Sequence, residues 1–250
     1  ANESFAGDHL GRVAGRSHLG TRTPVFRDHE PSCPFGLLTR GGAKELARQK
    51  HPRASEGMEL YFMRHGETAW ALTGQHTGKT DLALTGHGEA EARALGAMLR
   101  GVNFDHVFTS PRQRARRTAE LTGHVHAIVE PDLAEWDYGD YDGKRIDEIR
   151  AHRPAWDIYT DGCPGGESPG EITARADRLI ARWTSLPGRV AAFSHGHFGR
   201  VLVVRWIGLP LGMARHFAIG TASYGILDRD PGREHRPRIV QWNTTPTRLT

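Results

Sequence analysis

Residues 60–68 read Leu-Tyr-Phe-Met-Arg-His-Gly-Glu-Thr, a short apolar run that ends in a charged and polar turn. The apolar part is expected to form a buried strand, with Arg64, His65 and Gly66 at its carboxyl end. Further expected strands alternate with amphipathic helices along the rest of the chain. This alternation predicts an α/β fold.

The polar motifs fall where the expected strands end and helices begin, which is where open α/β sheets bind ligands. Ser110, Pro111 and Gln113 have the pattern of a helix capping box, and Ser168 and Glu171 repeat it. The expected helices are Gly86–Arg100, one from Ser110, one from Ser168 and one after His195 to Ile207, and the later strands are Val107–Thr109, Val190–Phe193, Tyr224–Leu227 and Ile239–Trp242.

The N-terminal segment, residues 1–57, shows no sustained helix or strand period. It holds nine Lys/Arg and six Asp/Glu, so it carries +3 of the chain's formal charge of +4. We expect a disordered extension or an over-extended start, and a functional domain over residues 58–250. Because nucleic-acid binders concentrate their charge on the folded domain, this distribution argues against that class of function.

The composition predicts neither a membrane segment nor a disulfide framework. No stretch approaches the roughly 20 apolar residues that span a bilayer, and no apolar signal segment opens the sequence. The two cysteines, Cys33 and Cys163, are isolated and form no metal-binding pair. We therefore expect a cytoplasmic protein with no metal and no cofactor.

Three segments repeat the layout of strand, polar turn and helix: residues 64–68, 110–114 and 194–197. A fourth segment, residues 135–139, carries a carboxylate beside two aromatic side chains. Helix N-termini and arginines supply the N–H donors and positive charge that a phosphate needs. Two arginines and two histidines without metal-ligand spacing favour phosphoryl transfer in which one histidine attacks phosphorus.

The run Arg-His-Gly-Glu-Thr resembles the signature of the histidine phosphatase superfamily, which includes cofactor-dependent phosphoglycerate mutases. The resemblance extends over residues 58–250: it includes a Ser-x-x-x-Arg-Ala-x-x-Thr-Ala segment at 110–119, the Glu135 loop, Gly-Glu-Ser at 166–168, and His195-Gly196. It implies a phosphoglycerate mutase-like, three-layer α/β/α sandwich with a mostly parallel central sheet.

The resemblance also implies roles for individual residues. His65 is the nucleophile that becomes phosphorylated, and Glu135 is the acid that protonates the leaving oxygen. Arg64, Arg114 and His195 bind the transferring phosphoryl group. The residues expected to contact the substrate are Thr77, Gly78, Arg112, Trp136, Tyr138, Gly196 and His197.

The chain departs from the mutases at three positions. Ala71, Trp136 and His197 stand where the mutases have asparagine, arginine and asparagine, and each change removes a polar contact to phosphoglycerate. Residues 135–163 instead resemble a phosphatase branch that contains sugar-bisphosphate phosphatases and small bacterial acid phosphatases. We therefore expect metal-independent hydrolysis of small phosphomonoesters, with sugar phosphates fitting well. A phosphoglycerate mutase is the alternative, a non-catalytic phospho-ligand-binding module is less favoured, and a homodimer stays open.

Glu135 must carry a proton to act as an acid, and we expect Trp136 and Tyr138 to desolvate it. With a neutral His65, this predicts an acidic to near-neutral optimum. His197 is equally compatible with helix-start packing and with a contact in the site. Ordinary structural roles are expected for several others: Glu167 and Ser168 in helix capping, Trp70 and Trp206 in packing, and His76, His87, His106, His124 and His126 in the core or on the surface.

Overall fold

The computed structural model describes residues 57–232 and 234–246. The expected N-terminal extension, residues 1–57, lies outside this part of the chain except for Gly57. The strands are β1 (Glu59–Arg64), β2 (His106–Thr109), β3 (Ile128–Val129), β4 (Arg189–Ser194), β5 (Tyr224–Asp230) and β6 (Arg236–Thr244). The helices are α1 (Ala69–Thr73), α2 (Gly86–Met98), α3 (Gln113–Leu121), α4 (Ile146–His152), α5 (Ile158–Asp161), α6 (Pro169–Trp183) and α7 (Gly196–Trp206), with short 3-10 helices at Pro131–Leu133, Gly139–Tyr141 and Leu211–His216.

The strands form one sheet in the order β3-β2-β4-β1-β5-β6. The first four strands in this order pair in parallel, and β5 and β6 join them antiparallel. In β1, Leu60 and Phe62 point to one face of the sheet, while Tyr61 and Met63 point to the other, and all four are buried. A strand that is apolar on both sides belongs in the middle of a covered sheet.

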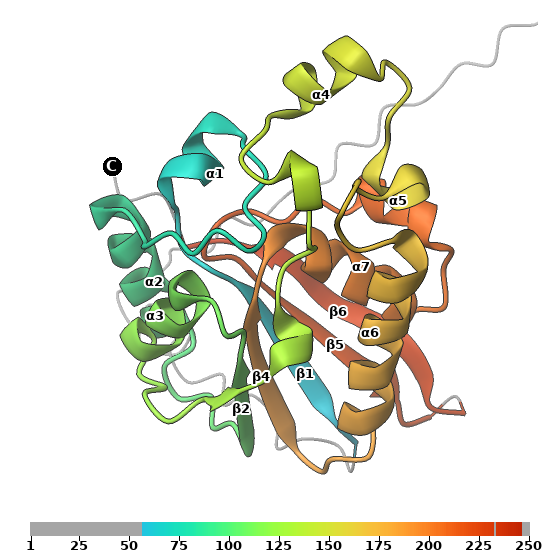
Figure 1. Ribbon diagram of the computed structural model, residues 1–250. Coiled ribbons are helices and arrows are strands. Elements are labelled where there is room, and N and C mark those ends of the chain that lie inside the picture. The colour runs from blue at the N-terminus through green and yellow to red at the C-terminus, as the bar shows by residue number, and fades with distance from the viewer. Residues whose placement is uncertain (1–56, 233, 247–250) are drawn as a thin grey trace, which may run out of the picture. The chain divides into compact units, whose positions relative to one another are not determined.

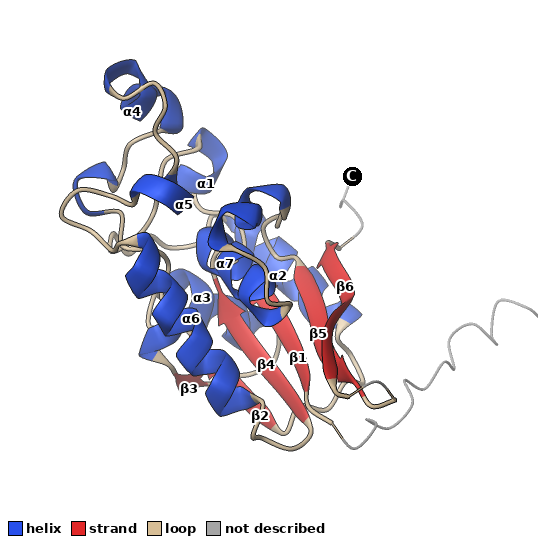
Figure 2. Ribbon diagram, turned by 90° about the vertical axis from the view of Figure 1, so that its right-hand side faces the viewer, coloured by secondary structure: helices blue, strands red, loops and turns tan. Residues whose placement is uncertain are grey.

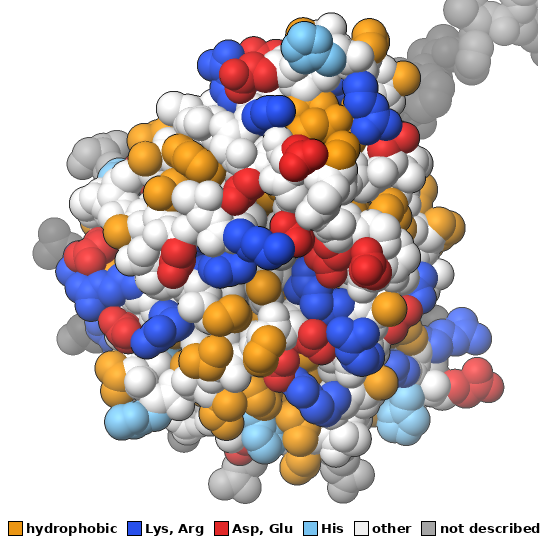
Figure 3. Space-filling model, in the orientation of Figure 1, with side chains coloured by type: hydrophobic (Ala, Val, Ile, Leu, Met, Phe, Trp, Pro, Cys, Tyr) orange, Lys and Arg blue, Asp and Glu red, His pale blue; other side chains and the backbone are white. Residues whose placement is uncertain are grey.

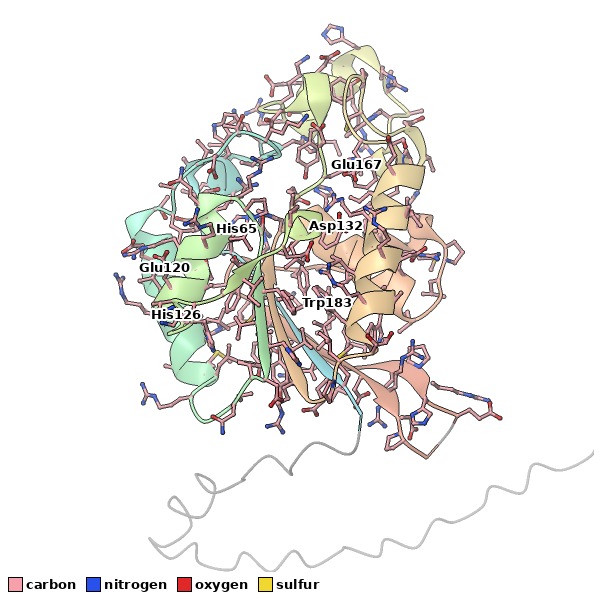
Figure 4. The ribbon with its side chains drawn as sticks, turned by 60° about the horizontal axis from the view of Figure 1, so that its bottom comes forward. His65, Glu120, His126, Asp132, Glu167 and Trp183 are labelled. Atoms are coloured by element: carbon pink, nitrogen blue, oxygen red, sulfur yellow. The ribbon has the colours of Figure 1, made fainter. Side chains whose placement is uncertain are left out.

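Two hydrophobic cores cover the two faces of the sheet (Figures 1 and 2). Helices α6 and α7 pack on one face, where Trp183 is fully buried and its ring stacks on Phe108 at 5.7 Å (Figure 4). Leu95 of α2 and Ala119 of α3 are buried on the other face. The predicted three-layer sandwich with a mostly parallel sheet is therefore confirmed.

The two predicted helix caps have different outcomes. At α6, Ser168 accepts from the backbone N–H of Glu171, whose carboxylate accepts in return, so this capping box is confirmed. The box predicted at Ser110 is wrong, since α3 begins only at Gln113. The backbone N–H of Gln113 instead donates to Asp81 Oδ1 at 2.8 Å. The acceptor at the start of α3 thus comes from a different part of the chain.

Helices α1, α4 and α5 lie beyond the carboxyl ends of the parallel strands (Figure 1). They belong to the connections after β1 and β3, and no helix was expected there from the sequence. In Figure 3, basic and acidic side chains are interspersed over the visible face, without a large area of one sign. No helix within the described ranges is both long and apolar enough to cross a membrane.

Candidate active site

His65 lies at the carboxyl end of β1, where the backbone fixes it on both sides. Its N–H donates to the carbonyl of Ser194 at the end of β4, and its own carbonyl accepts from the N–H of Ala222, both at 3.0 Å. The next residue is glycine because a Cβ at Gly66 would lie 2.3 Å from the carbonyl oxygen of Gly88. The motif His-Gly therefore permits the close backbone approach that holds the histidine.

The His65 ring has a defined tautomer. Its Nδ1 lies 2.7 Å from the carbonyl oxygen of Gly66, so Nδ1 carries the hydrogen and donates it. Burial, together with the positive charges of Arg114 and Arg64, holds the ring pKa well below its usual value of 6.5. The neutral ring thus keeps its lone pair on Nε2, which is the arrangement that a nitrogen nucleophile requires.

A cavity of about 150 Å³ opens beside His65. Seven of the predicted site residues contribute to its wall: Arg64, His65, Thr77, Glu135, Tyr138, Gly196 and His197. These residues come from the end of β1, the start of α7 and two loops, so the topology brings together motifs that are more than 100 residues apart. His197 is in this wall, which favours the site contact that the sequence had left as one of two alternatives.

Arg64 offers unused hydrogen-bond donors at this cavity. One terminal nitrogen donates to the carbonyl of Ile219 at 2.7 Å, whereas Nε has no partner among the described residues. Gly196 lies directly beside the guanidinium, since a Cβ at this position would be in van der Waals contact with Arg64 Cζ at 3.5 Å. A half-buried cation with a free N–H group next to a nucleophile suits binding of the oxygens of a phosphoryl group.

Arg114 and His195 lie directly behind His65. The rings of His65 and His195 are 5.2 Å apart. Arg114 is fully buried, and its Nε donates to His195 Nδ1 at 3.2 Å, so His195 carries its hydrogen on Nε2 and donates it to Ser110 Oγ at 2.7 Å. Burial and the charge of Arg114 hold the His195 pKa well below 6.5.

The remaining nitrogens of Arg114 donate to the carbonyl oxygens of Thr77, Gly78 and Thr80. Neither Arg114 nor His195 is among the residues that line the cavity. Their contact with a phosphoryl group stays a prediction. What the structure shows is a hydrogen-bonded layer that supports His65 and the loop after α1.

Glu135 belongs to a loop, and its carboxylate lies against the N-terminus of α7. Oε1 accepts from the backbone N–H groups of Trp136 and Phe198 at 2.9 and 2.8 Å, and Oε2 accepts from that of His197 at 3.0 Å. Two of these three donors belong to the first turn of α7, so the carboxylate is held against the start of that helix. The role of Glu135 as the acid stays a prediction.

The other predicted contact residues lie away from the cavity wall. Trp136 is fully buried and its indole N–H donates to the carbonyl of Glu167 at 2.8 Å. The N–H of Gly78 donates to Asp142 at 2.7 Å, so this donor is already used. Arg112 lines a separate cavity of about 340 Å³ that also reaches Glu135. In this conformation the three residues shape the surroundings of the site.

The cavity wall also includes residues that were not among the predicted site residues: Thr68, Trp70, Ala71, Gly74, Gln75, His76 and Arg200. Arg200 could have been found from helical spacing, because it follows Gly196 by four residues on α7 and so shares its face. His76 directly precedes the predicted loop residues Thr77 and Gly78. Trp70 had been interpreted as a packing residue, whereas Trp206 is buried as expected.

Arg175 of α6 anchors the loop that carries Glu135. Its guanidinium donates to the carbonyl oxygens of Asp132 and Ala134, both at 2.7 Å, and to both carboxylate oxygens of Glu167 at 2.9 and 2.7 Å. Glu167 thus acts as the partner of Arg175, and the cap of α6 is Ser168. A bidentate pair buried to this degree fixes geometry, and breaking one partner is costly.

We predict that Arg175→Lys lowers kcat by about 10- to 100-fold while KM changes by less than about threefold. Lysine keeps the charge but cannot hold two carbonyls and a carboxylate at once, so the loop and Glu135 shift. Steady-state kinetics on an alkyl phosphate would measure this. Arg93→Lys, at an exposed arginine of α2 that pairs with Glu89, is the matched control, and an equal loss in both variants would contradict the prediction.

The described residues contain no group of three or more His, Cys, Asp or Glu side chains that could hold a metal ion. Residues 60–245 match the histidine phosphatase superfamily, branch 1. The chain belongs to the histidine phosphatase superfamily. The match spans both halves of the sheet and every motif from which the resemblance was inferred.

Among the relatives, an acid phosphatase of Mycobacterium tuberculosis is 42% identical over 69% of this chain and 87% of its own length. Sedoheptulose 1,7-bisphosphatase of Saccharomyces cerevisiae is 37% identical over 59% of this chain and 67% of its own. A probable phosphoglycerate mutase GpmB of Erwinia tasmaniensis is 31% identical over 68% and 85%.

A solved structure from Mycobacterium tuberculosis, that of a functionally characterised open reading frame, has a TM-score of 0.71 and 39% identity, and covers 76% of this chain and 99% of that one. The fold and the order of the site motifs along the chain are therefore those of histidine phosphatases. Phosphatases and mutases both occur among the related proteins, so the site geometry has to separate the two functions.

Proposed function

We propose that this histidine phosphatase is a metal-independent phosphomonoester hydrolase that forms a phosphohistidine on His65 and acts on small phosphorylated metabolites, sugar phosphates among them. The observation that carries the proposal is the hydrogen bond from His65 Nδ1 to Gly66, which leaves Nε2 as a lone-pair nucleophile at the cavity. Residues 58–250 carry the activity, in line with the family match over residues 60–245.

The reaction has two displacements at phosphorus. In the first, His65 Nε2 forms a bond to phosphorus, the ester P–O bond breaks, and the leaving oxygen takes a proton from Glu135. In the second, water attacks the phosphohistidine, the P–N bond breaks, and the Glu135 carboxylate takes a proton from that water. The products are the alcohol and inorganic phosphate, and Glu135 returns to its acid form.

Glu135 is suited to alternate between the two protonation states. Its three backbone N–H donors hold the carboxyl group in place for both steps. A phosphoryl dianion next to it favours the acid form that the first step needs, because like charges disfavour ionisation. Substrate binding and product release would therefore set its protonation.

Hydrolysis is favoured over the mutase reaction by the residues around the cavity. The side chain of Ala71 lines the cavity without a polar group, and Trp136 is buried where the mutases place an arginine. A mutase must hold a phosphoglycerate while the phosphoryl group returns, and these positions offer it no charged contact. A binding module would not need a nucleophile and an acid in one cavity.

A panel of phosphomonoesters plus 3-phosphoglycerate, assayed with EDTA present, tests the function. Release of phosphate that persists in EDTA supports the metal-independent hydrolase. Formation of 2-phosphoglycerate without phosphate release would make the protein a mutase, and binding without turnover would favour a phospho-ligand module.

The location is proposed to be cytoplasmic, since Cys163 is a free, buried thiol. A homodimer remains an alternative to the monomer, and light scattering of the purified chain would decide between them.

We predict that kcat/KM on alkyl phosphates rises as the pH falls from about 8 to about 6, without a decline near 6.5. The rise reflects protonation of Glu135 for the leaving group. The absent decline reflects the lowered pKa of His65: a base with a depressed pKa stays neutral below 6.5 and loses its lone pair only at a more acidic pH. A pH–rate profile measures both, and a steady increase toward about pH 9 would contradict the assignment of the acid.

A further inference from the structure

His76 presents a hydrogen-bond acceptor to the active-site cavity. Its ring Nδ1 lies 2.7 Å from the carbonyl oxygen of Lys144, and a carbonyl can only accept, so Nδ1 carries the hydrogen. Burial lowers the pKa of the ring, which is therefore neutral near pH 7. The lone pair is consequently on Nε2, and no described residue donates to that atom.

The ring is held rigidly in this orientation. The backbone of His76 pairs with Lys144 and Gly143, at 2.9 and 2.8 Å. The ring stacks on His197 at 5.8 Å and 20°, and the edges of Tyr138 and Trp156 contact it at 4.8 and 5.7 Å. A preorganised acceptor of this kind loses little entropy when a ligand binds.

The position of His76 places it at the leaving-group side of the reaction. It lines the same cavity as His65, and its stacking partner His197 follows Gly196 at the start of α7. The backbone N–H of His197 binds Glu135 Oε2, and Glu135 is the group that must meet the leaving oxygen. If Glu135 protonates that oxygen, the carbon chain attached to it would extend along the wall that contains His76.

The lone pair on His76 Nε2 determines which substrate groups can bind next to it. A neutral imidazole nitrogen accepts from an O–H donor but repels a second phosphate or a carboxylate, which offer only acceptors at neutral pH. An alkyl chain would leave the nitrogen without a partner, and a buried acceptor without a partner costs free energy.

We propose that His76 is a specificity-determining residue that accepts a hydrogen bond from a substrate hydroxyl group, so that the enzyme selects phosphoesters of polyhydroxylated alcohols such as sugars and polyols. The inference rests on the proposed function, because it concerns what the same cavity binds beside the phosphoryl group. It replaces the structural role that the sequence suggested for His76.

Two substrates with the same three-carbon skeleton test this directly: glycerol 3-phosphate, which has two hydroxyl groups, and propyl phosphate, which has none. We expect the wild-type enzyme to prefer glycerol 3-phosphate by about 10- to 100-fold in kcat/KM. His76→Phe keeps a flat ring without the acceptor, and its preference should fall to less than about threefold. His76→Gln restores an acceptor oxygen and should recover part of the preference.

The comparison of the two ratios cancels the difference in reactivity between the two esters. His126→Phe, at an exposed histidine outside the cavity wall, is the matched control and should keep the full preference. An equal loss on both substrates in His76→Phe would overturn the proposal and make His76 a structural support. A wild-type enzyme that hydrolyses both esters equally would also overturn it, yet leave the phosphatase function standing. Only a wild-type enzyme that hydrolyses neither would count against that function.

Discussion

Replacing His65 by alanine is expected to lower kcat/KM for phosphomonoesters by about 10⁴-fold or more. The variant loses the only bond-forming atom of the first step, because Nε2 is the nitrogen that attacks phosphorus. Arg64 and Arg200 remain in the cavity wall, so substrate binding should change far less than turnover. Rates of phosphate release at saturating and at low substrate concentration give kcat and kcat/KM, and so separate the loss of turnover from any loss of binding.

His87→Ala serves as the control, since His87 is exposed and lies outside the cavity wall. It should retain wild-type activity within about twofold. The same melting temperature for His65→Ala and the wild type would show that the loss is chemical. Activity of His65→Ala within about 100-fold of wild type would mean that water attacks phosphorus directly and that the histidine only assists.

Replacing Glu135 by glutamine is expected to have an effect that depends on the leaving group. For an alkyl phosphate, whose alkoxide is a poor leaving group, we expect a loss of about 10²- to 10⁴-fold in kcat/KM. For p-nitrophenyl phosphate, which expels a stable phenolate without protonation, the loss of kcat/KM should be below about 10-fold. A series of phosphoesters whose leaving groups differ in pKa, assayed with the wild type and the variant, measures both losses of kcat/KM.

Part of the change in Glu135→Gln comes from geometry. The carboxylate accepts three backbone N–H bonds, and an amide nitrogen facing one of those donors would repel it. Such a displacement would affect all substrates alike, so the leaving-group dependence isolates the acid role. Glu120→Gln, at the surface pair with Arg117, is the control and should leave both rates unchanged. A loss independent of the leaving group would remove Glu135 from the acid role.

The α/β core was predictable because it depends on local patterns. The apolar run of β1 that ends at Arg64, and the apolar stripe of α6 behind Ser168, each specify one element and its buried side. The strand ends at His65 and Ser194 were expected to meet because parallel strands carry their polar motifs to the same edge.

The features that the sequence did not predict depend on contacts between distant segments. Asp81 supplies the acceptor at the start of α3, so the local Ser-Pro pattern at Ser110 predicted the wrong cap for this helix. Ser110 instead accepts from His195, 85 positions along the chain. His76 became part of the site only because the loop after α1 folds against α7. Neither hydrophobic periodicity nor a sequence motif predicts a contact between segments so far apart in the chain.

The measurement that tests the central claim most directly is detection of the phosphorylated residue. Glu135→Gln would be mixed with p-nitrophenyl phosphate and quenched in alkali, because phosphohistidine survives base and hydrolyses in acid. Since Glu135 also activates the water of the second step, the variant should accumulate the intermediate. We predict one phosphoryl group per chain, on the peptide that contains His65, and none after His65→Ala. A phosphoryl group on another residue, or turnover with no phosphoenzyme under any quench, would contradict the account.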